Sequence, residues 1–309
     1  MSDKTIVSPP VVNGLSAVWL GFVLLVLIWA YNWVVAKNVL QFVGAFDFAA
    51  LRSAAGVLTL FFILLLARRP LRPPPLIPTV VLGLLQTCAY MLLMNLALVG
   101  GGAGKVAVLA YSMPFWTLFC AWLVLQERIR GLQWLAILLA FAGMWVIVDP
   151  FRLQGSLPSK LLALGAGLAW ALATVYAKWL RRRLAFDVLS MTAWQMACGT
   201  FPLLPLAWWV PQPPLRPEPY FWFALAYAGV FASGFGWWMW MHVLQRMPAG
   251  TVSLNALAIP VLAVLAAWVE HGERPLAQEL AGMSMVAAAL GLLSWITLQQ
   301  QRQGARHRN

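Results

Sequence analysis

The sequence predicts an all-α membrane protein, and three observations support this fold class. Of its 309 residues, 62% are hydrophobic and only 10% are charged, whereas a soluble globular domain is roughly 45–50% apolar and about 25% charged. The mean hydropathy is +0.79. The charges gather in short clusters between apolar runs whose length, about 18 to 25 residues, is the length that crosses a bilayer as a helix. We therefore expect a bundle of membrane-spanning helices.

Ten apolar runs are expected to form ten transmembrane helices. They cover residues 15–36, 47–67, 77–98, 104–126, 131–149, 160–180, 188–209, 220–244, 250–269 and 277–298. A membrane β-barrel would instead show alternating segments of about ten residues. Runs such as "LTLFFILLLA" do not alternate, so we exclude a barrel. The proline clusters "RRPLRPPPLIP" and "VPQPPLRPEP" fall between runs, where a missing N–H does no harm.

The basic residues predict the orientation of the chain. With the N-terminus inside, 14 Lys and Arg residues fall on the inner side and 6 on the outer side. By the positive-inside rule, both termini are expected in the cytoplasm, and the protein in a bacterial-type inner membrane. The net charge of +12 therefore indicates topology. We expect a lipid bilayer and a small-molecule substrate as partners, and no nucleic acid.

One apolar segment occurs twice in the sequence, with substitutions. Residues 103–128 read "AGKVAVLAYSMPFWTLFCAWLVLQER", and residues 249–274 read "AGTVSLNALAIPVLAVLAAWVEHGER", with nine of 26 positions identical at an offset of 146. "WAYNWVVAK" (29–37) and "WALATVYAK" (170–178) also match, at an offset of 141. The matched helices are five apart and so cross the membrane in opposite directions. We therefore expect two inverted five-helix repeats.

This repeat sets the expected domain organisation and function. The expected parts are an N-terminal tail 1–14, a first repeat 15–149, a linker 150–159, a second repeat 160–298 and a basic tail 299–309. In transporters, inverted repeats place the substrate site at their interface near mid-membrane and expose it alternately to each side. The sequence therefore predicts a secondary transporter that works by alternating access through a central cavity.

Several of these segments also resemble a known family. "WAYNWVVAK" resembles the helix 1 signature of EamA-type members of the drug/metabolite transporter superfamily, with Ala30 in place of a glycine. "DFAALRSAAG" is similar to the start of their helix 2, and both repeated segments are similar to their proline-containing helices. The resemblance implies a cavity surrounded by helices 1, 3, 4, 6, 8 and 9, with helices 5 and 10 peripheral. It also implies export of amino acids, drugs or other small metabolites without ATP hydrolysis.

Polar and aromatic residues inside the runs are the candidates for the cavity wall, because polar side chains at this depth usually face the bundle interior. The candidates are Trp29, Asn32, Tyr90, Tyr111, Trp170, Thr174, Gln195 and Asn255. Pro114 and Pro260 stand at equivalent places in the two halves and are expected hinges, since each removes a helical hydrogen bond. Either hinge could alternatively be a packing kink.

Charged groups suggest further roles. Arg52 either pairs between helices near the outer surface or holds a substrate carboxylate, and His242 is the candidate for proton coupling. Two adjacent pairs are expected as gate or loop ion pairs: Glu127 with Arg128, and Glu273 with Arg274. Lys37 and Lys178 are expected to reach opposite membrane surfaces and anchor the gating helices.

Other functional classes have less support. An intramembrane enzyme would need a cluster of catalytic groups at one depth, and His242 is the one histidine inside an apolar run. We expect no enzyme, no cofactor and no metal. A facilitative importer or a non-transporting membrane subunit stays open as an alternative. A homodimer is also open, although nothing in the sequence supports one.

Overall fold

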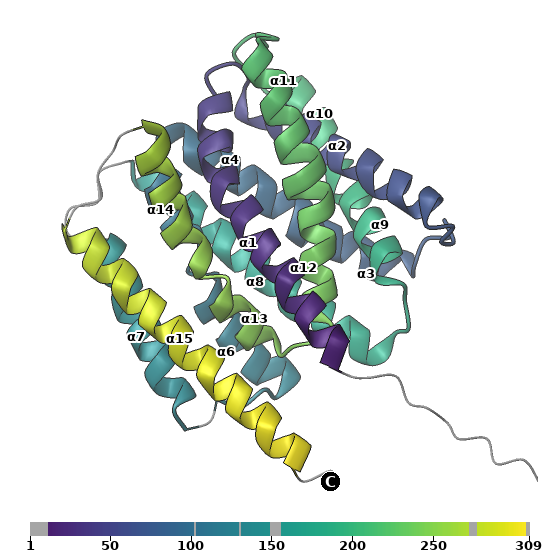
Figure 1. Ribbon diagram of the computed structural model, residues 1–309. Coiled ribbons are helices and arrows are strands. Elements are labelled where there is room, and N and C mark those ends of the chain that lie inside the picture. Colours follow the sequence, from purple (N-terminus) through teal and green to yellow (C-terminus); the bar gives the residue numbers. More distant parts are fainter. Residues whose placement is uncertain (1–11, 102, 130, 149–155, 272–276, 307–309) are drawn as a thin grey trace, which may run out of the picture.

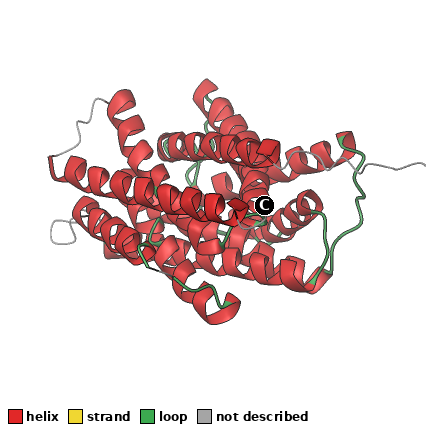
Figure 2. Cartoon of the chain, turned by 60° about the horizontal axis from the view of Figure 1, so that its bottom comes forward, coloured by secondary structure: helices red, strands yellow, loops and turns green. Residues whose placement is uncertain are grey.

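The computed structural model describes residues 12–101, 103–129, 131–148, 156–271 and 277–306, and every regular element in these ranges is a helix (Figures 1 and 2). In chain order the elements are α1 (Val12–Val39), α2 (Ala45–Leu66), α3 (Leu76–Gly83), η1 (Leu84–Ala89), α4 (Tyr90–Gly100), α5 (Ala103–Ala110), α6 (Met113–Leu125), α7 (Gln133–Val148), α8 (Leu157–Arg183), α9 (Val188–Thr200), α10 (Leu203–Trp209), α11 (Pro219–Ala226), η2 (Tyr227–Phe235), α12 (Gly236–Leu244), α13 (Ala249–Asn255), α14 (Ala258–His271) and α15 (Ala277–Arg306). The expected all-α class is confirmed.

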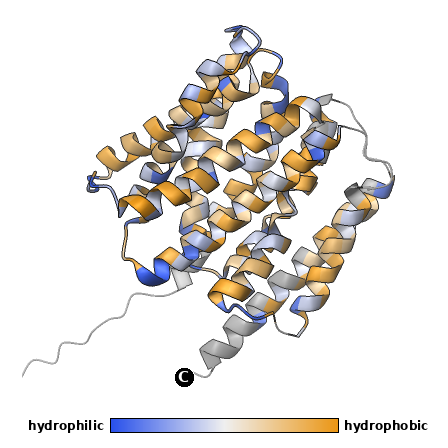
Figure 3. Cartoon of the chain, turned by 180° about the vertical axis from the view of Figure 1, so that it is seen from behind, coloured by the Kyte–Doolittle hydropathy of each residue, from blue (hydrophilic) through white to orange (hydrophobic). Residues whose placement is uncertain are grey.

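The helices present apolar surface outward, as a lipid environment requires. Six helical segments among the described residues are long and apolar enough to cross a membrane: Val18–Val39, Ala45–Leu66, Leu76–Gly100, Val106–Leu125, Leu157–Arg183 and Ala249–Glu270. Leu20 and Leu58 are each 72% exposed, which water would penalise and lipid would not. Hydrophobic colours dominate the helices, while hydrophilic colours gather towards their ends and in the loops (Figure 3). The protein is an integral multi-pass membrane protein.

Two lysines define the two ends of the bundle. The segments α11, η2 and α12 follow one another without a break as one helix. Just before this helix begins, the N–H of Arg216 donates to the carbonyl of Phe42, at 2.8 Å. At its far end, Lys178 donates to the carbonyl of Leu244. Phe42 lies just after α1, the helix that carries Lys37, so Lys37 and Lys178 lie at opposite ends of the bundle. We call these the Lys37 end and the Lys178 end.

Helices α7 and α15 form a peripheral pair. They pack along each other at one edge of the bundle (Figures 1 and 3). They correspond to the apolar runs 131–149 and 277–298, which are helices 5 and 10 in the expected count. This arrangement agrees with the peripheral place that the family resemblance implies for them.

Both repeated segments are broken helices, and proline explains the break. The chain turns at Tyr111–Ser112 between α5 and α6 and at Ala256–Leu257 between α13 and α14. Pro114 lies two residues after the first break, and Pro260 lies three residues after the second. Neither has an N–H to donate to the carbonyl four residues earlier in the chain. In the first half that carbonyl belongs to Ala110, and a Cβ on Gly167 of α8 would lie only 2.6 Å from it.

Two π-helical segments were not predicted from the sequence. Leu84–Ala89 (η1) is the repeat equivalent, at the offset of 146, of the last six residues of η2. Both segments lie at close helix crossings: η2 packs on α2, and η1 packs on α9. At the first crossing a Cβ on Gly56 would lie 2.9 Å from the Cβ of Ser233. Wide turns of this kind are frequent at functional sites.

Candidate functional site

Six aromatic side chains meet in the centre of the bundle. Trp29 and Trp170, which are repeat equivalents, lie with ring centroids 5.4 Å apart. Four further rings surround this pair at centroid distances between 5.0 and 5.7 Å: Tyr90, Tyr111, Trp237 and Trp240. All six are buried. We call this group the aromatic cluster. It comes from α1, α4, the turn between α5 and α6, α8 and α12.

Four members of the aromatic cluster were predicted as cavity residues, and two were missed. The structure brings Trp29, Tyr90, Tyr111 and Trp170 together. Trp237 and Trp240 were not among the candidates. Their spacing of three residues puts them on one face of a helix, and this was the signal that could have found them. Trp238, between them, packs against His242 instead, with ring centroids 6.0 Å apart.

The two halves differ at the aromatic cluster. The indole N–H of Trp29 donates to the carbonyl of Ala232, at 2.9 Å. Its equivalent, the indole nitrogen of Trp170, is buried without a partner. At the offset of 146, the equivalent of Ala232 is Gln86, whose side-chain amide is also buried with neither atom hydrogen-bonded. The equivalent positions therefore differ in pairing: the Trp29 indole N–H has an acceptor, whereas the Trp170 indole N–H and the Gln86 amide have no partner.

Arg52 is buried beside the aromatic cluster and links three helices. Its Nε donates to Ser233 Oγ at 3.3 Å, and its Nη2 donates to Asn32 Oδ1 at 3.4 Å. Its third nitrogen, Nη1, has no partner. The central carbon of the guanidinium lies 5.5 Å from the centroid of the Phe48 ring. Its partners are neutral, so Arg52 forms a hydrogen-bonded link in the interior and not an ion pair near the surface.

The other polar candidates make separate contacts. Gln195 accepts a hydrogen bond from Thr87 at 3.1 Å, while its Nε2 is buried without a partner. The hydroxyl of Thr174, one turn beyond Trp170, is also unpartnered. Asn255 donates to the carbonyl of Thr251 in its own helix, at 2.9 Å. Buried polar atoms without partners are costly, so a polar ligand that reached Gln195 Nε2 or the Thr174 hydroxyl would be stabilised there.

Each end of the bundle carries a lysine clamp. Lys37 Nζ donates to the carbonyls of Leu98 and Gly101, at 2.8 and 3.0 Å. Lys178 Nζ donates to the carbonyls of Leu244 and Met247, both at 2.6 Å. The acceptors in the two clamps are 146 residues apart, so the clamps are repeat equivalents. The lysines were expected to reach the membrane surfaces. In the structure each binds free carbonyls at a helix end, where a cation is favoured.

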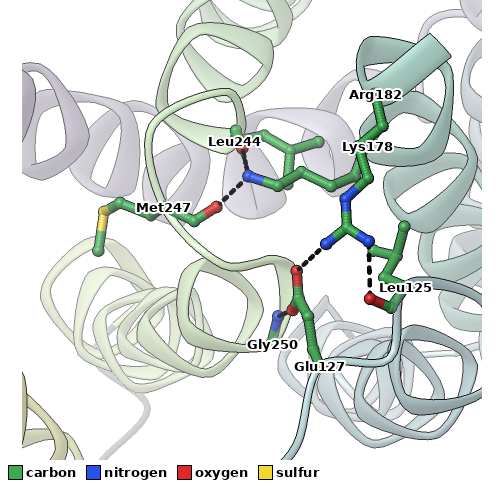
Figure 4. A network of polar contacts seen from close by, with 7 residues as sticks. All are labelled: Leu125, Glu127, Lys178, Arg182, Leu244, Met247 and Gly250. Atoms are coloured by element: carbon green, nitrogen blue, oxygen red, sulfur yellow. Dashed lines mark hydrogen bonds and ion pairs between the residues drawn. The ribbon is translucent and has the colours of Figure 1, made fainter.

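A second network joins helices at the Lys178 end (Figure 4). The carboxylate of Glu127 lies 3.8 Å from Arg182 Nη2 and accepts from the N–H of Gly250, at 3.4 Å. Arg182 Nη1 donates to the carbonyl of Leu125, at 2.7 Å. Gln126 adopts a left-handed conformation with φ of 55°, which ends α6 and turns the chain at Glu127. The network joins the end of α6 to α8 and to the start of α13.

One of the two predicted ion pairs lies within the described residues, and its glutamate has a different partner. Glu127 pairs with Arg182 and not with the adjacent Arg128, because neighbouring residues do not face each other. Arg128 is exposed and lines a cavity of about 560 Å³ between α6, the start of α7 and α13. Glu273 and Arg274 lie outside the described residues. His242 packs on Trp238, away from the aromatic cluster.

The fold and the site define a class of membrane protein. A lipid-facing helical bundle encloses a buried aromatic and polar centre, with equivalent clamps at opposite ends. Within the described residues, no group of three or more His, Cys, Asp or Glu could hold a metal ion. Such an arrangement is typical of a transporter built from internal repeats.

The chain belongs to the EamA-like transporter family, whose model matches it twice, over residues 16–149 and 157–295. This result confirms the family that the sequence motifs indicated. The family, like the names of the relatives below, indicates a transporter and not an enzyme.

Named relatives and a solved structure agree with this assignment. The uncharacterized transporter YoaV of Bacillus subtilis (strain 168) is 27% identical over 83% of this chain and 89% of its own length. The "probable amino-acid metabolite efflux pump" of Salmonella typhimurium is 25% identical over 86% of this chain and 91% of its own. A solved crystal structure of a protein that is 20% identical in sequence has a TM-score of 0.76 and covers 92% of this chain and 99% of its own. The two proteins therefore share the fold.

Proposed function

We propose that this protein is a secondary transporter that exports small organic metabolites, such as amino acids or amphiphilic drugs, by alternating access. The observation that carries this proposal is the pair of equivalent clamps, Lys37 and Lys178, at opposite ends of a buried aromatic centre. The clamps use different helices at each end. One can therefore open while the other stays closed.

The mechanism assigns a gate to each end. At the Lys178 end, opening releases Leu244 and Met247 from Lys178 and separates Glu127 from Gly250. The cavity of about 560 Å³ already reaches from Glu127 to Leu254 at this end, so opening extends it towards the aromatic cluster. The breaks before Pro114 and Pro260 serve as hinges. At the other end, release of Leu98 and Gly101 from Lys37 provides the equivalent opening.

The distribution of charge supports a cytoplasmic position for the Lys178 end. Arg181, Arg182 and Arg183 form the last turn of α8 at this end, and the positive-inside rule puts such clusters on the cytoplasmic side. Both termini are then cytoplasmic, and the protein lies in the inner membrane. The name of the Salmonella relative, a probable amino-acid metabolite efflux pump, supports amino-acid metabolites as substrates and export as the direction. Facilitative import and a non-transporting subunit are the alternatives.

The test is release from proteoliposomes that contain the purified full chain and a radiolabelled amino-acid mixture, with and without a pH gradient. We expect saturable release that one unlabelled amino acid competes for. Protein-free vesicles measure passive leak. Release no faster than this leak under both conditions would contradict amino-acid export. If release requires the gradient, replacing His242 by Asn tests the one candidate proton carrier.

A further inference from the structure

Arg52 is a buried cation without a counter-ion. The residue is 2% exposed, and its two hydrogen-bond acceptors, Asn32 Oδ1 and Ser233 Oγ, carry no charge. A buried charge is normally paired or bound to an opposite charge, because losing hydration is costly. Among the described residues, no carboxylate forms an ion pair with it. The positive charge of Arg52 therefore lacks a negatively charged partner among the described residues.

The geometry of the guanidinium shows where an anion would bind. Nε and Nη2 are directed at Ser233 and Asn32, while Nη1 is buried and has no acceptor. Arginine binds carboxylates through parallel N–H···O bonds. A carboxylate beside Nη1 would satisfy that donor and supply the missing negative charge.

The surroundings of Arg52 indicate the rest of the ligand. Ser233, which accepts from Arg52 Nε, directly follows Ala232, whose carbonyl accepts from the indole N–H of Trp29 in the aromatic cluster. A ligand with its carboxylate at Arg52 would therefore place its body among aromatic rings, which favour a flat apolar group.

The positions of the acidic residues indicate which ligand charge has no partner in the interior. Those whose burial the structure describes lie at helix ends or in loops: Asp47, Glu127, Asp187, Glu218 and Glu270. None is available in the described interior to pair with an ammonium group. A carboxylate is thus recognised by a charged partner, whereas an amine has no equivalent partner.

We propose that the central site requires a carboxylate on its substrate, held by Arg52, with an aromatic or other flat apolar body among the cluster rings, and that an amino group is dispensable. The substrate class is therefore an amphiphilic carboxylate, of which an aromatic amino acid is one example. This inference rests on the proposed transport function, because it assumes that the buried centre is the substrate site.

The test compares four probes that share a phenyl group: 3-phenylpropanoate, its size-matched amide 3-phenylpropanamide, L-phenylalanine and 2-phenylethylamine. Their binding to the purified full chain is measured by quenching of tryptophan fluorescence. We expect both carboxylates to bind at least about tenfold more tightly than the amide or the amine. The Arg52 guanidinium would stay without a negatively charged acceptor when the amide or the amine is bound, and a buried polar group left unpaired disfavours binding. In Arg52→Gln the preference for acid over amide should fall to about threefold or less, while Arg52→Lys should keep part of it.

The ratio of acid affinity to amide affinity is measured within each variant. A loss of folded protein would reduce the binding of both probes alike and would leave this ratio unchanged. Arg72→Gln removes an exposed charge from a loop and should retain the wild-type ratio. An unchanged ratio in Arg52→Gln would overturn the proposal, as would equal binding of acid and amide, or no binding of either carboxylate, by the wild type. A carboxylate preference without flux in proteoliposomes would retain the site and reject the transport function.

Discussion

Replacing Lys178 with methionine is expected to open the Lys178 end, and replacing Lys37 is expected to open the other end. Each ammonium donates to two carbonyls at a helix terminus. Hydrogen bonds to charged groups contribute about 1.5–3 kcal/mol when buried. The lysines are only partly buried, so we expect about 1.5 kcal/mol per clamp, or roughly a tenfold shift towards the open gate.

Cysteine labelling would measure this shift at both ends. Val106 and Val252 are buried repeat equivalents near the Lys37 end and the Lys178 end. In a variant without the native cysteines, Lys178→Met should raise the labelling rate of Val252→Cys about tenfold and leave that of Val106→Cys unchanged. Lys37→Met should do the reverse. Equal increases at both ends would indicate general loosening of the bundle and contradict separate gates.

Restoring the hydrogen-bond donors at the two helix breaks is expected to slow transport. Pro114→Ala supplies an N–H for the carbonyl of Ala110, and Pro260→Ala supplies one for Ala256. Alanine favours a continuous helix by about 3 kcal/mol relative to proline, so the bent conformation becomes harder to reach. We expect the double variant to lose at least about tenfold in exchange rate while its thermal stability is retained or raised.

The control for this prediction is Pro202→Ala. Pro202 precedes α10 and has no proline at the equivalent place in the first half, so the symmetric hinge does not use it. Its substitution should leave the exchange rate within about twofold of the wild type. Wild-type exchange by the Pro114→Ala, Pro260→Ala double variant would remove the prolines from the mechanism.

Composition and internal repetition were enough to predict the fold class and part of the site. The apolar runs required a membrane bundle, and the matched segments placed Trp29 and Trp170 at equivalent positions. These two rings do meet in the structure. The helix breaks were also predictable, because proline removes a specific hydrogen bond in whatever packing surrounds it.

The remaining features depend on contacts between distant helices. The acceptors of Lys178 are carbonyls 66 and 69 residues away, and a carbonyl has no side-chain signature. The pairing of Glu127 with Arg182 depends on how α6 ends against α8. The π-helical segments η1 and η2 carry no local marker. The isolation of Arg52 from carboxylates became visible only once its neighbours were known.

The central claim is that each end must open in turn, and cross-linking the gates tests it most directly. One cysteine pair replaces Glu127 and Arg182 at the Lys178 end. The other replaces Asn38 and Glu270, whose side chains lie 3.2 Å apart at the Lys37 end. Exchange is measured in proteoliposomes before and after treatment with a short, cleavable bis-thiol cross-linker. The account predicts that either cross-link alone abolishes exchange and that cleavage restores it. Full exchange with either gate locked would contradict it.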